Sequence, residues 1–187
     1  MVQASNHANQ TISIDLPSFI GLHVNDDQFK ALADANRDLR LERTAQGELV
    51  VNPPTGGETG ERNWSISGEI YLWWRSAGEP GRGFDSSSGF ALPNGAIRSP
   101  DAAWVAEDRW NRLTTEQRSG IVPLCPDFVV ELRSPSDGRS TLQNKMQEYI
   151  SNGARLGWLI DPQERRVDIY RPGVEVERLD DPAELSG

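Results

Sequence analysis

The alternation of apolar and polar residues predicts an N-terminal helix followed by a hairpin. Asn25 is suited to cap a helix whose first turn holds two acids, as the positive end of a helix dipole favours. Apolar residues at every second position then predict strands over residues 38–44 and 48–52, around a turn at 45–47. Glu42 is therefore expected on the solvated face of this hairpin. The expected inward side chains are Leu39, Leu41, Leu49 and Val51.

A longer helix is predicted over residues 61–77. Four apolar residues recur there at helical spacing and are expected to form a core stripe, namely Ile66, Ile70, Trp73 and Trp74. Residues 78–94 are rich in Gly and Ser, which is typical of a hairpin leading into the next strand. Residues 11–16 also alternate apolar and polar side chains, which predicts a short edge strand or an ordered arm.

The second half of the chain alternates strands and helices. Thr114 and Gln117 have the spacing of a capping box, and residues from 171 onward are expected to form a loose acidic tail. Several antiparallel strands followed by strand, helix and strand predict an α/β domain of three layers, with helices flanking a central mixed β-sheet. The expected strands are 99–105, 128–132, 156–160 and 166–170, and helices are expected within 107–120 and from Ser140 or Thr141.

Glu131 lies inside the apolar strand 128–132. Burial of an ionised carboxylate costs several kcal/mol unless a cation, a metal or hydrogen bonds compensate it. The sequence offers Arg133, which strand alternation places on the same face, Lys145 on the next helix, or a divalent metal. For a single acid, a structural ion pair with Arg133 is the simplest interpretation.

A second acid, Asp101, follows Pro100 at the start of another predicted strand. Two carboxylates on neighbouring strands can hold one hard cation such as Mg²⁺, which takes oxygen ligands. Metal-dependent hydrolysis of a phosphodiester uses such a pair together with a basic residue. The metal polarises the phosphate and lowers the pKa of a bound water, and the basic residue stabilises the developing charge.

An ordered series of motifs over about residues 29–172 resembles the PD-(D/E)XK nuclease superfamily. Within it, the chain is most similar to the Uma-type family of restriction-endonuclease-like proteins. The resemblance implies a restriction-endonuclease-like fold and activity on DNA. The motifs are Pro100-Asp101, Glu131-Leu132-Arg133 with Ser134-Pro135-Ser136, then Lys145, Tyr149 and the run Gly157-Trp158-Leu159-Ile160-Asp161-Pro162.

The resemblance also implies a site. Asp101 and Glu131 would be catalytic metal ligands for Mg²⁺ or Mn²⁺, with the Leu132 carbonyl as a third ligand. The superfamily's lysine is Arg133 here, which stays protonated but can bind phosphate or neutralise Glu131. The family's catalytic lysine corresponds to Lys145, about 85° from the centre of its helix's apolar stripe. Glu58 would be a supporting acid from the first core helix, with Glu69 as the alternative.

Composition limits the function classes. A net charge of −9 argues against broad coating of nucleic acid, which needs clustered Lys and Arg. The single cysteine, Cys125, excludes an intrachain disulfide, and neither it nor the serine-rich turn at 85–89 has a histidine nearby for nucleophilic catalysis. No run is long and apolar enough to cross a membrane and no signal-peptide pattern is present, so a cytoplasmic protein is expected.

The expected function is that of a Mg²⁺-dependent endonuclease hydrolysing DNA phosphodiester bonds. A homodimer is expected, because two related sites on a two-fold axis can cut both strands. The alternative is a catalytically inactive nuclease-fold module that binds nucleic acid or protein, which Arg133 and the acidic charge favour. The expected organisation is an arm over residues 1–24, the nuclease-like domain over 25–172 and an acidic tail over 173–187.

Overall fold

The computed structural model describes residues 22–186, so the strand expected over 11–16 lies outside the described residues. The helices are α1 (Asp26–Ala35), α2 (Gly57–Ser76), α3 (Glu107–Asn111), α4 (Thr115–Ser119) and α5 (Arg139–Ser151). The strands are β1 (Arg40–Arg43), β2 (Leu49–Asn52), β3 (Arg82–Asp85), β4 (Phe90–Ala91), β5 (Ile97–Arg98), β6 (Ala102–Val105), β7 (Phe128–Leu132), β8 (Leu156–Asp161), β9 (Arg166–Tyr170) and β10 (Glu177–Asp180).

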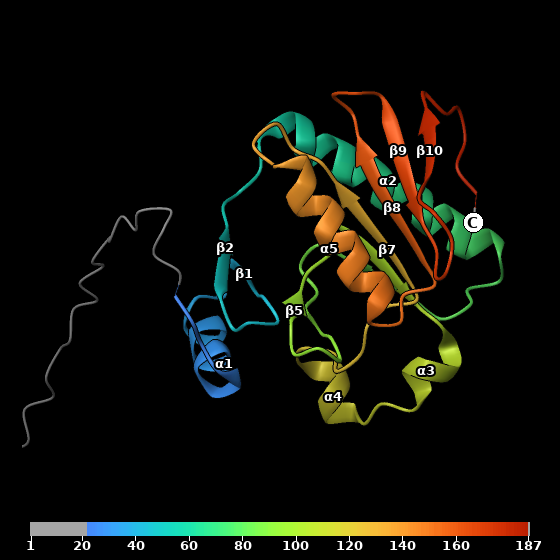
Figure 1. Cartoon of the computed structure of the whole chain (residues 1–187). Coiled ribbons are helices and arrows are strands. Elements are labelled where there is room, and N and C mark those ends of the chain that lie inside the picture. Colours follow the sequence, from blue (N-terminus) through green and yellow to red (C-terminus); the bar gives the residue numbers. More distant parts are fainter. Residues whose placement is uncertain (1–21, 187) are drawn as a thin grey trace, which may run out of the picture.

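The larger sheet is mixed, as predicted. Its order is β10-β9-β8-β7-β6-β3, and only the β7–β8 pair is parallel. A parallel pair needs a crossover, and α5 provides it between β7 and β8. Figure 1 shows α5 in front of this sheet and α2 behind it. The predicted three-layer α/β architecture is therefore confirmed.

A smaller sheet lies beside the larger one, in the order β2-β1-β5-β4. Its β1–β2 hairpin has the predicted turn, and β1 also pairs with β5 through Arg43 and Ile97. Three residues after β5, the chain enters β6 of the larger sheet. The segment that carries Asp101 therefore joins the two sheets.

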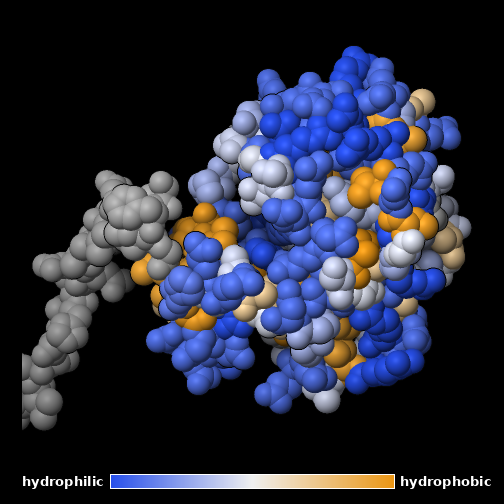
Figure 2. Space-filling model, in the orientation of Figure 1, coloured by the Kyte–Doolittle hydropathy of each residue, from blue (hydrophilic) through white to orange (hydrophobic). Residues whose placement is uncertain are grey.

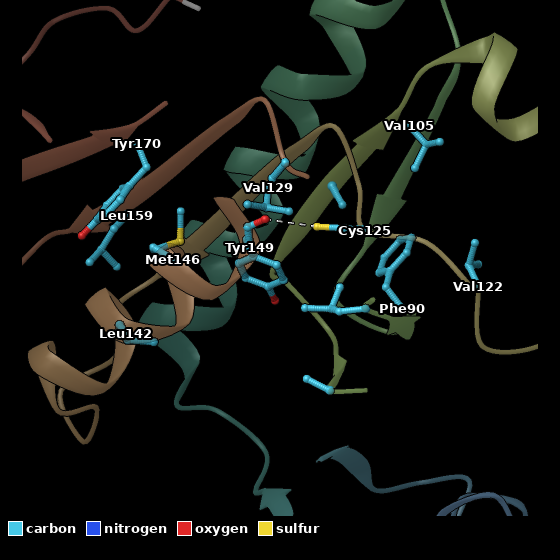
Figure 3. Packing of buried hydrophobic residues seen from close by; sticks show 14 residues of the cluster. Phe90, Val105, Val122, Cys125, Val129, Leu142, Met146, Tyr149, Leu159 and Tyr170 are labelled. Carbon is cyan, nitrogen blue, oxygen red and sulfur yellow. Dashed lines mark hydrogen bonds between the residues drawn. The ribbon is translucent and has the colours of Figure 1, made fainter. Parts of the chain in front are cut away.

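The main apolar core fills the space between α5 and the larger sheet. Met146 and Tyr149 of α5 are fully buried against Val129 and Leu159 of the central strands (Figure 3). Gly157 of β8 allows this close approach, because a Cβ there would lie 2.4 Å from the Met146 Cε. The glycine thus sets the distance between α5 and the sheet.

The prediction for the side chains of the β1–β2 hairpin was wrong for Leu39, Val51 and Glu42, whereas Leu41 and Leu49 are half-buried. Leu39 and Val51 are exposed, whereas Glu42 and Arg43 of β1 are buried. The buried guanidinium of Arg43 donates to the Gly95 carbonyl at 2.8 Å, and Glu42 pairs with cations from other elements. Compensating partners, which the local pattern does not reveal, decide which face of β1 is covered.

The hairpin expected over residues 78–94 is also absent from the described structure. β3 pairs with β6 in the larger sheet, while β4 pairs with β5 in the smaller one. The Ser- and Gly-rich turn therefore passes the chain between sheets. At the C-terminal end, the segment expected to be loose contains β10, which pairs with β9 over four residues.

The helix expected over 61–77 begins earlier, as α2 at Gly57. Ile66, Ile70 and Trp74 of the expected stripe are half-buried, and Trp73 is exposed. Helix α2 fully buries only Thr59. Helix α2 therefore buries few side chains against the sheet, and a large part of its surface is exposed.

The surface seen from the α5 side is mostly hydrophilic (Figure 2). Hydrophobic residues appear there as small separate patches rather than one continuous area. Within residues 22–186, no helix has both the length and the apolar character that a transmembrane segment requires.

Candidate active site

Asp101 and Glu131 face each other across two antiparallel strands. The β6–β7 register pairs Ala102 with Val130, and continuing it by one position puts Asp101 opposite Glu131. Both acids are buried, with 8% and 2% of their surfaces exposed. The Leu132 N–H donates to Asp101 Oδ2 at 2.8 Å, which ties the two strand ends together. The structure thus brings the two predicted acids to one place.

Lys145 reaches this place from α5. Its Nζ lies 2.8 Å from Glu131 Oε1, and 11% of its side chain is exposed. Its predicted position at the rim of the apolar stripe lets the stem pack while the ammonium extends to the acids. Of the two basic residues considered as partners for Glu131, Lys145 is the one that contacts it, whereas Arg133 pairs with Asp161.

Tyr149 holds Glu131 from the same helix. Its ring lies among the apolar side chains of the core (Figure 3), and its hydroxyl donates to Glu131 Oε1 at 2.9 Å. Tyr149 follows Lys145 by one helical turn, so both side chains project from one side of α5. The Glu131 carboxylate is therefore oriented by two donors on one rigid element.

Glu42 is the site residue that sequence reasoning missed. Its Oε1 accepts from Lys145 Nζ and from the Ser99 N–H, both at 2.9 Å, and only 3% of its surface is exposed. The expectation that it lies on a solvated face was wrong. Charged residues occupy three of the four positions of β1, a local pattern typical of solvent exposure, and the compensating lysine is 103 positions away.

Three further polar residues surround the acids. Arg40 Nη1 lies 3.1 Å from Asp101 Oδ1. Arg98 contacts Glu42 at 3.4 Å and Glu148 at 2.6 Å. These contacts give Asp101 and Glu42 cationic partners on β1 and β5, in addition to Lys145 on α5. The acids therefore occupy a network in which each has a cationic partner.

Burial and mutual repulsion shift the proton affinities of these groups. Burial, assisted by the charges of Asp101 and Glu42, raises the pKa of Glu131 to about 7 despite the neighbouring Lys145. Burial alone would lower the pKa of Lys145, but Glu131 and Glu42 more than offset this and raise it. Lys145 is thus an ammonium at neutral pH, and Glu131 exchanges its proton in the same range.

The pKa values of Glu42 and Tyr149 shift in opposite directions. Burial would raise the pKa of Glu42, but Lys145, the Ser99 N–H and Arg98 lower it overall, so this acid carries the permanent negative charge. Burial and the nearby Glu131 raise the pKa of Tyr149 well above its ordinary value. Tyr149 therefore acts as a neutral hydrogen-bond donor.

The donor atoms fit a hard divalent cation. Asp101 and Glu131 provide carboxylate oxygens on neighbouring strands, and carboxylate oxygens are a donor type that Mg²⁺ prefers. Within residues 22–186, no three His, Cys, Asp or Glu side chains are close enough to form a ready-made metal cluster. The ammonium of Lys145 lies between Glu42 and Glu131 instead.

The two supporting residues predicted from sequence lie elsewhere. Arg133 Nη1 pairs with Asp161 at 2.9 Å and its Nε donates to the Asp137 carbonyl at 3.2 Å, so it contacts β8 rather than Glu131. The Glu58 side chain is 87% exposed and its one described ion pair, at 3.7 Å, is with Arg62 on the same helix. The structure does not bring either residue to the acids.

Comparison with known proteins identifies the family of this chain. The family model described as "Putative restriction endonuclease" matches residues 26–187. The chain belongs to the Uma2 family. The resemblance inferred from the motifs is thereby confirmed, and the matched range includes Glu42, Asp101, Glu131 and Lys145.

A solved structure shows that the fold of this Uma2 chain has been seen before. A putative nuclease of DUF820 from Anabaena variabilis ATCC 29413 superposes with a TM-score of 0.67 at 23% sequence identity. The alignment covers 79% of this chain and 80% of that one. None of the curated proteins compared with the chain matches it.

Proposed function

We propose that this Uma2 protein is a Mg²⁺- or Mn²⁺-dependent endonuclease that hydrolyses DNA phosphodiester bonds. The observation that carries the proposal is the convergence of Asp101 and Glu131 on adjacent strands, with the Lys145 ammonium 2.8 Å from Glu131. Two oxygen ligands and one fixed cation are what phosphodiester hydrolysis requires. Family membership and the shared fold support the assignment.

In this proposal Asp101 and Glu131 hold the metal, with the Leu132 carbonyl as a third ligand. When bound, the metal supplies Lewis-acid polarisation of the phosphate and a lowered pKa for a bound water. Lys145 has three N–H donors, of which two contact Glu42 and Glu131, so the third can reach a phosphate oxygen or the attacking water. Tyr149 keeps Glu131 in position throughout.

The test is cleavage of supercoiled plasmid DNA with Mg²⁺ or Mn²⁺ by matched variants. We expect Asp101→Asn and Glu131→Gln each to lower the cleavage rate at least about a hundredfold, because each removes an anionic ligand at the reacting phosphate. The matched control is Asp127→Asn. Asp127 is also buried and precedes β7, but it contacts Arg109 and the Ala106 N–H at the other end of the same strands.

The control should change stability and leave metal-dependent cleavage intact. Equal loss of cleavage in all three variants would indicate a folding effect and contradict the assigned roles. Wild-type protein that cleaves none of linear, supercoiled or single-stranded DNA with either metal would overturn the proposal itself.

A second candidate is a nuclease-fold module without catalytic activity that binds nucleic acid or protein. The closed ion network favours it, since Lys145, Arg40 and Arg98 already balance the acids. Calorimetric titration with Mn²⁺ separates the two. If the protein is a nuclease, the wild type should bind Mn²⁺ and the Glu131→Gln variant should not. If it is an inactive module, neither the wild type nor the variant should give a heat of Mn²⁺ binding.

A further inference from the structure

Helix α2 carries an apolar face that the fold leaves uncovered. Trp64 is 81% exposed, Tyr71 56% and Leu72 59%. Exposed aromatic residues of this size normally find a partner, because each can bury roughly 150–250 Å². Figure 1 shows α2 on the opposite side of the larger sheet from α5, the helix that carries Lys145.

Helical geometry places these residues around a single centre. At about 100° per residue, Trp64 and Leu72 lie about 40° to either side of Gly68, and Tyr71 lies about 60° from it. Thr59, the one fully buried residue of α2, lies about 180° from Gly68. The sheet contacts come from the Thr59 side of the helix, so Gly68 marks the middle of the outward face.

Gly68 leaves room for close approach by another helix. A Cβ at this position would meet no heavy atom within 4 Å, and the φ angle of this helical glycine is not positive. Neither local packing nor backbone strain therefore requires glycine here, although glycine destabilises a helix interior relative to alanine. A partner helix crossing at Gly68 would account for it.

The charges are arranged symmetrically about the same centre. Glu61 and Arg75 lie seven positions before and after Gly68, both on the exposed face, and Arg75 Nη1 also pairs with Glu79 of its own chain. We infer that a second copy of this chain packs on α2 in antiparallel orientation, with the two helices crossing at Gly68. Glu61 then faces Arg75 of the partner subunit, and Trp64 faces Leu72 of the partner subunit.

The pattern distinguishes this occupant from others. An antiparallel pair on a two-fold axis makes each of these contacts twice. A parallel pair would set Glu61 against the partner's Glu61 and Arg75 against the partner's Arg75, which like-charge repulsion disfavours. An unrelated protein or a lipid surface would not require opposite charges at equal spacing from one glycine. This inference does not depend on the proposed nuclease function.

Cysteine cross-linking of the full chain tests the crossing point. In the Gly68→Cys variant the two thiols should meet at the two-fold axis and form a disulfide-linked dimer under mild oxidation. Cys125 is buried and does not compete. In the matched Arg75→Cys variant, on the same face, the thiols would be roughly 20 Å apart and should not cross-link. Cross-linking of Arg75→Cys but not Gly68→Cys would overturn the antiparallel arrangement.

Sedimentation velocity tests the contacts. Trp64→Ala should weaken the dimer at least about a hundredfold, since it removes two buried tryptophans per dimer. Glu69→Arg, on the same helix but about 100° from Gly68, is the control and should leave the dimer unchanged. A wild-type protein that remains monomeric at about 100 µM would overturn the inference.

Charge exchange gives the sharpest test. Glu61→Arg and Arg75→Glu should each weaken their own dimer about tenfold or more, because both create two like-charge contacts. Mixed together, the two variants should form a heterodimer, since every contact then pairs opposite charges. Failure of the mixture to associate, while wild type does, would show that Glu61 and Arg75 do not face each other.

Discussion

At the scale of single residues, the candidate site depends on one lysine shared by two acids. Lys145 Nζ lies 2.8 Å from Glu131 and 2.9 Å from Glu42. Glu42 has additional hydrogen-bond donors that lower its pKa and keep it charged. The pKa of Glu131, in contrast, is raised to about 7. The two carboxylates therefore differ in role: Glu42 anchors the ammonium, and Glu131 can bind or release a proton near neutral pH.

The first residue-scale prediction concerns pH. The pKa of Glu131 is raised to about 7, so a metal must displace its proton at lower pH. Mn²⁺ affinity should fall about tenfold per pH unit below about 7 and be nearly independent of this group above it. Calorimetric titrations from pH 5.5 to 8 measure this. An affinity that does not change between pH 6 and 7 would contradict it.

The same shift has a consequence for stability. Between about 4.5 and 7 the folded state binds the Glu131 proton more tightly than the unfolded state, so the unfolding free energy should fall as pH rises through this window. In Glu131→Gln this part of the pH dependence should disappear, while Asp127→Asn should retain it. Urea unfolding at several pH values provides the measurement.

A second prediction concerns Glu42. Glu42→Gln leaves an acceptor for the Ser99 N–H but removes the charge that faces Lys145 and Arg98. The unfolding free energy should fall by about 1–3 kcal/mol, the cost of leaving buried charged donors poorly paired. Glu48→Gln, at an exposed acid of the same hairpin, should change it by less than about 0.5 kcal/mol. Equal effects of the two would contradict the assigned position of Glu42.

At the scale of elements, α5 is positioned by its contact with β8. Its apolar residues pack on the sheet, and its polar residues Lys145 and Tyr149 then reach the end of β7. The distance between α5 and the sheet is limited by Gly157. Any change in that distance moves both donors relative to Glu131.

Gly157→Ala tests this coupling. The added Cβ would lie 2.4 Å from Met146 Cε, so the flexible methionine must move or α5 must shift outward. We expect a loss of about 1–3 kcal/mol in unfolding free energy by urea denaturation, and a lower Mn²⁺ affinity. The double variant with Met146→Ala should recover the metal affinity, because it removes the clash. Gly83→Ala, at a β3 glycine with open space, is the control.

At the scale of the whole molecule, the site lies where the two sheets meet. Glu42 comes from the smaller sheet, Glu131 from the larger one, and Asp101 from the segment that joins them. Most ordered arginines of the described chain pair with acids, which agrees with the net charge of −9. Contact with DNA would thus depend on the few cations around the site rather than on a broad basic surface.

The sequence alone predicted the mixed α/β fold, most element positions and the placing of Asp101 and Glu131 on neighbouring strands. These follow from local patterns: periodicity marks a helix or strand, and an acid within an apolar strand signals an unusual environment. The order of motifs also identified the family. The position of Lys145 at the rim of its helix's apolar stripe indicated that its side chain extends over the sheet edge toward Glu131.

Only the tertiary structure decided which cations compensate those acids. Arg133 is two residues from Glu131 yet pairs with Asp161, while Glu42 comes from a strand whose pattern is typical of solvent exposure. Which face of a strand or helix is buried depends in the same way on the elements that pack against it, as the buried Glu42 of β1 and the exposed Trp64 of α2 show. The physical reason is that burial of a charge is decided by partners distant in sequence, and local periodicity contains no information about them.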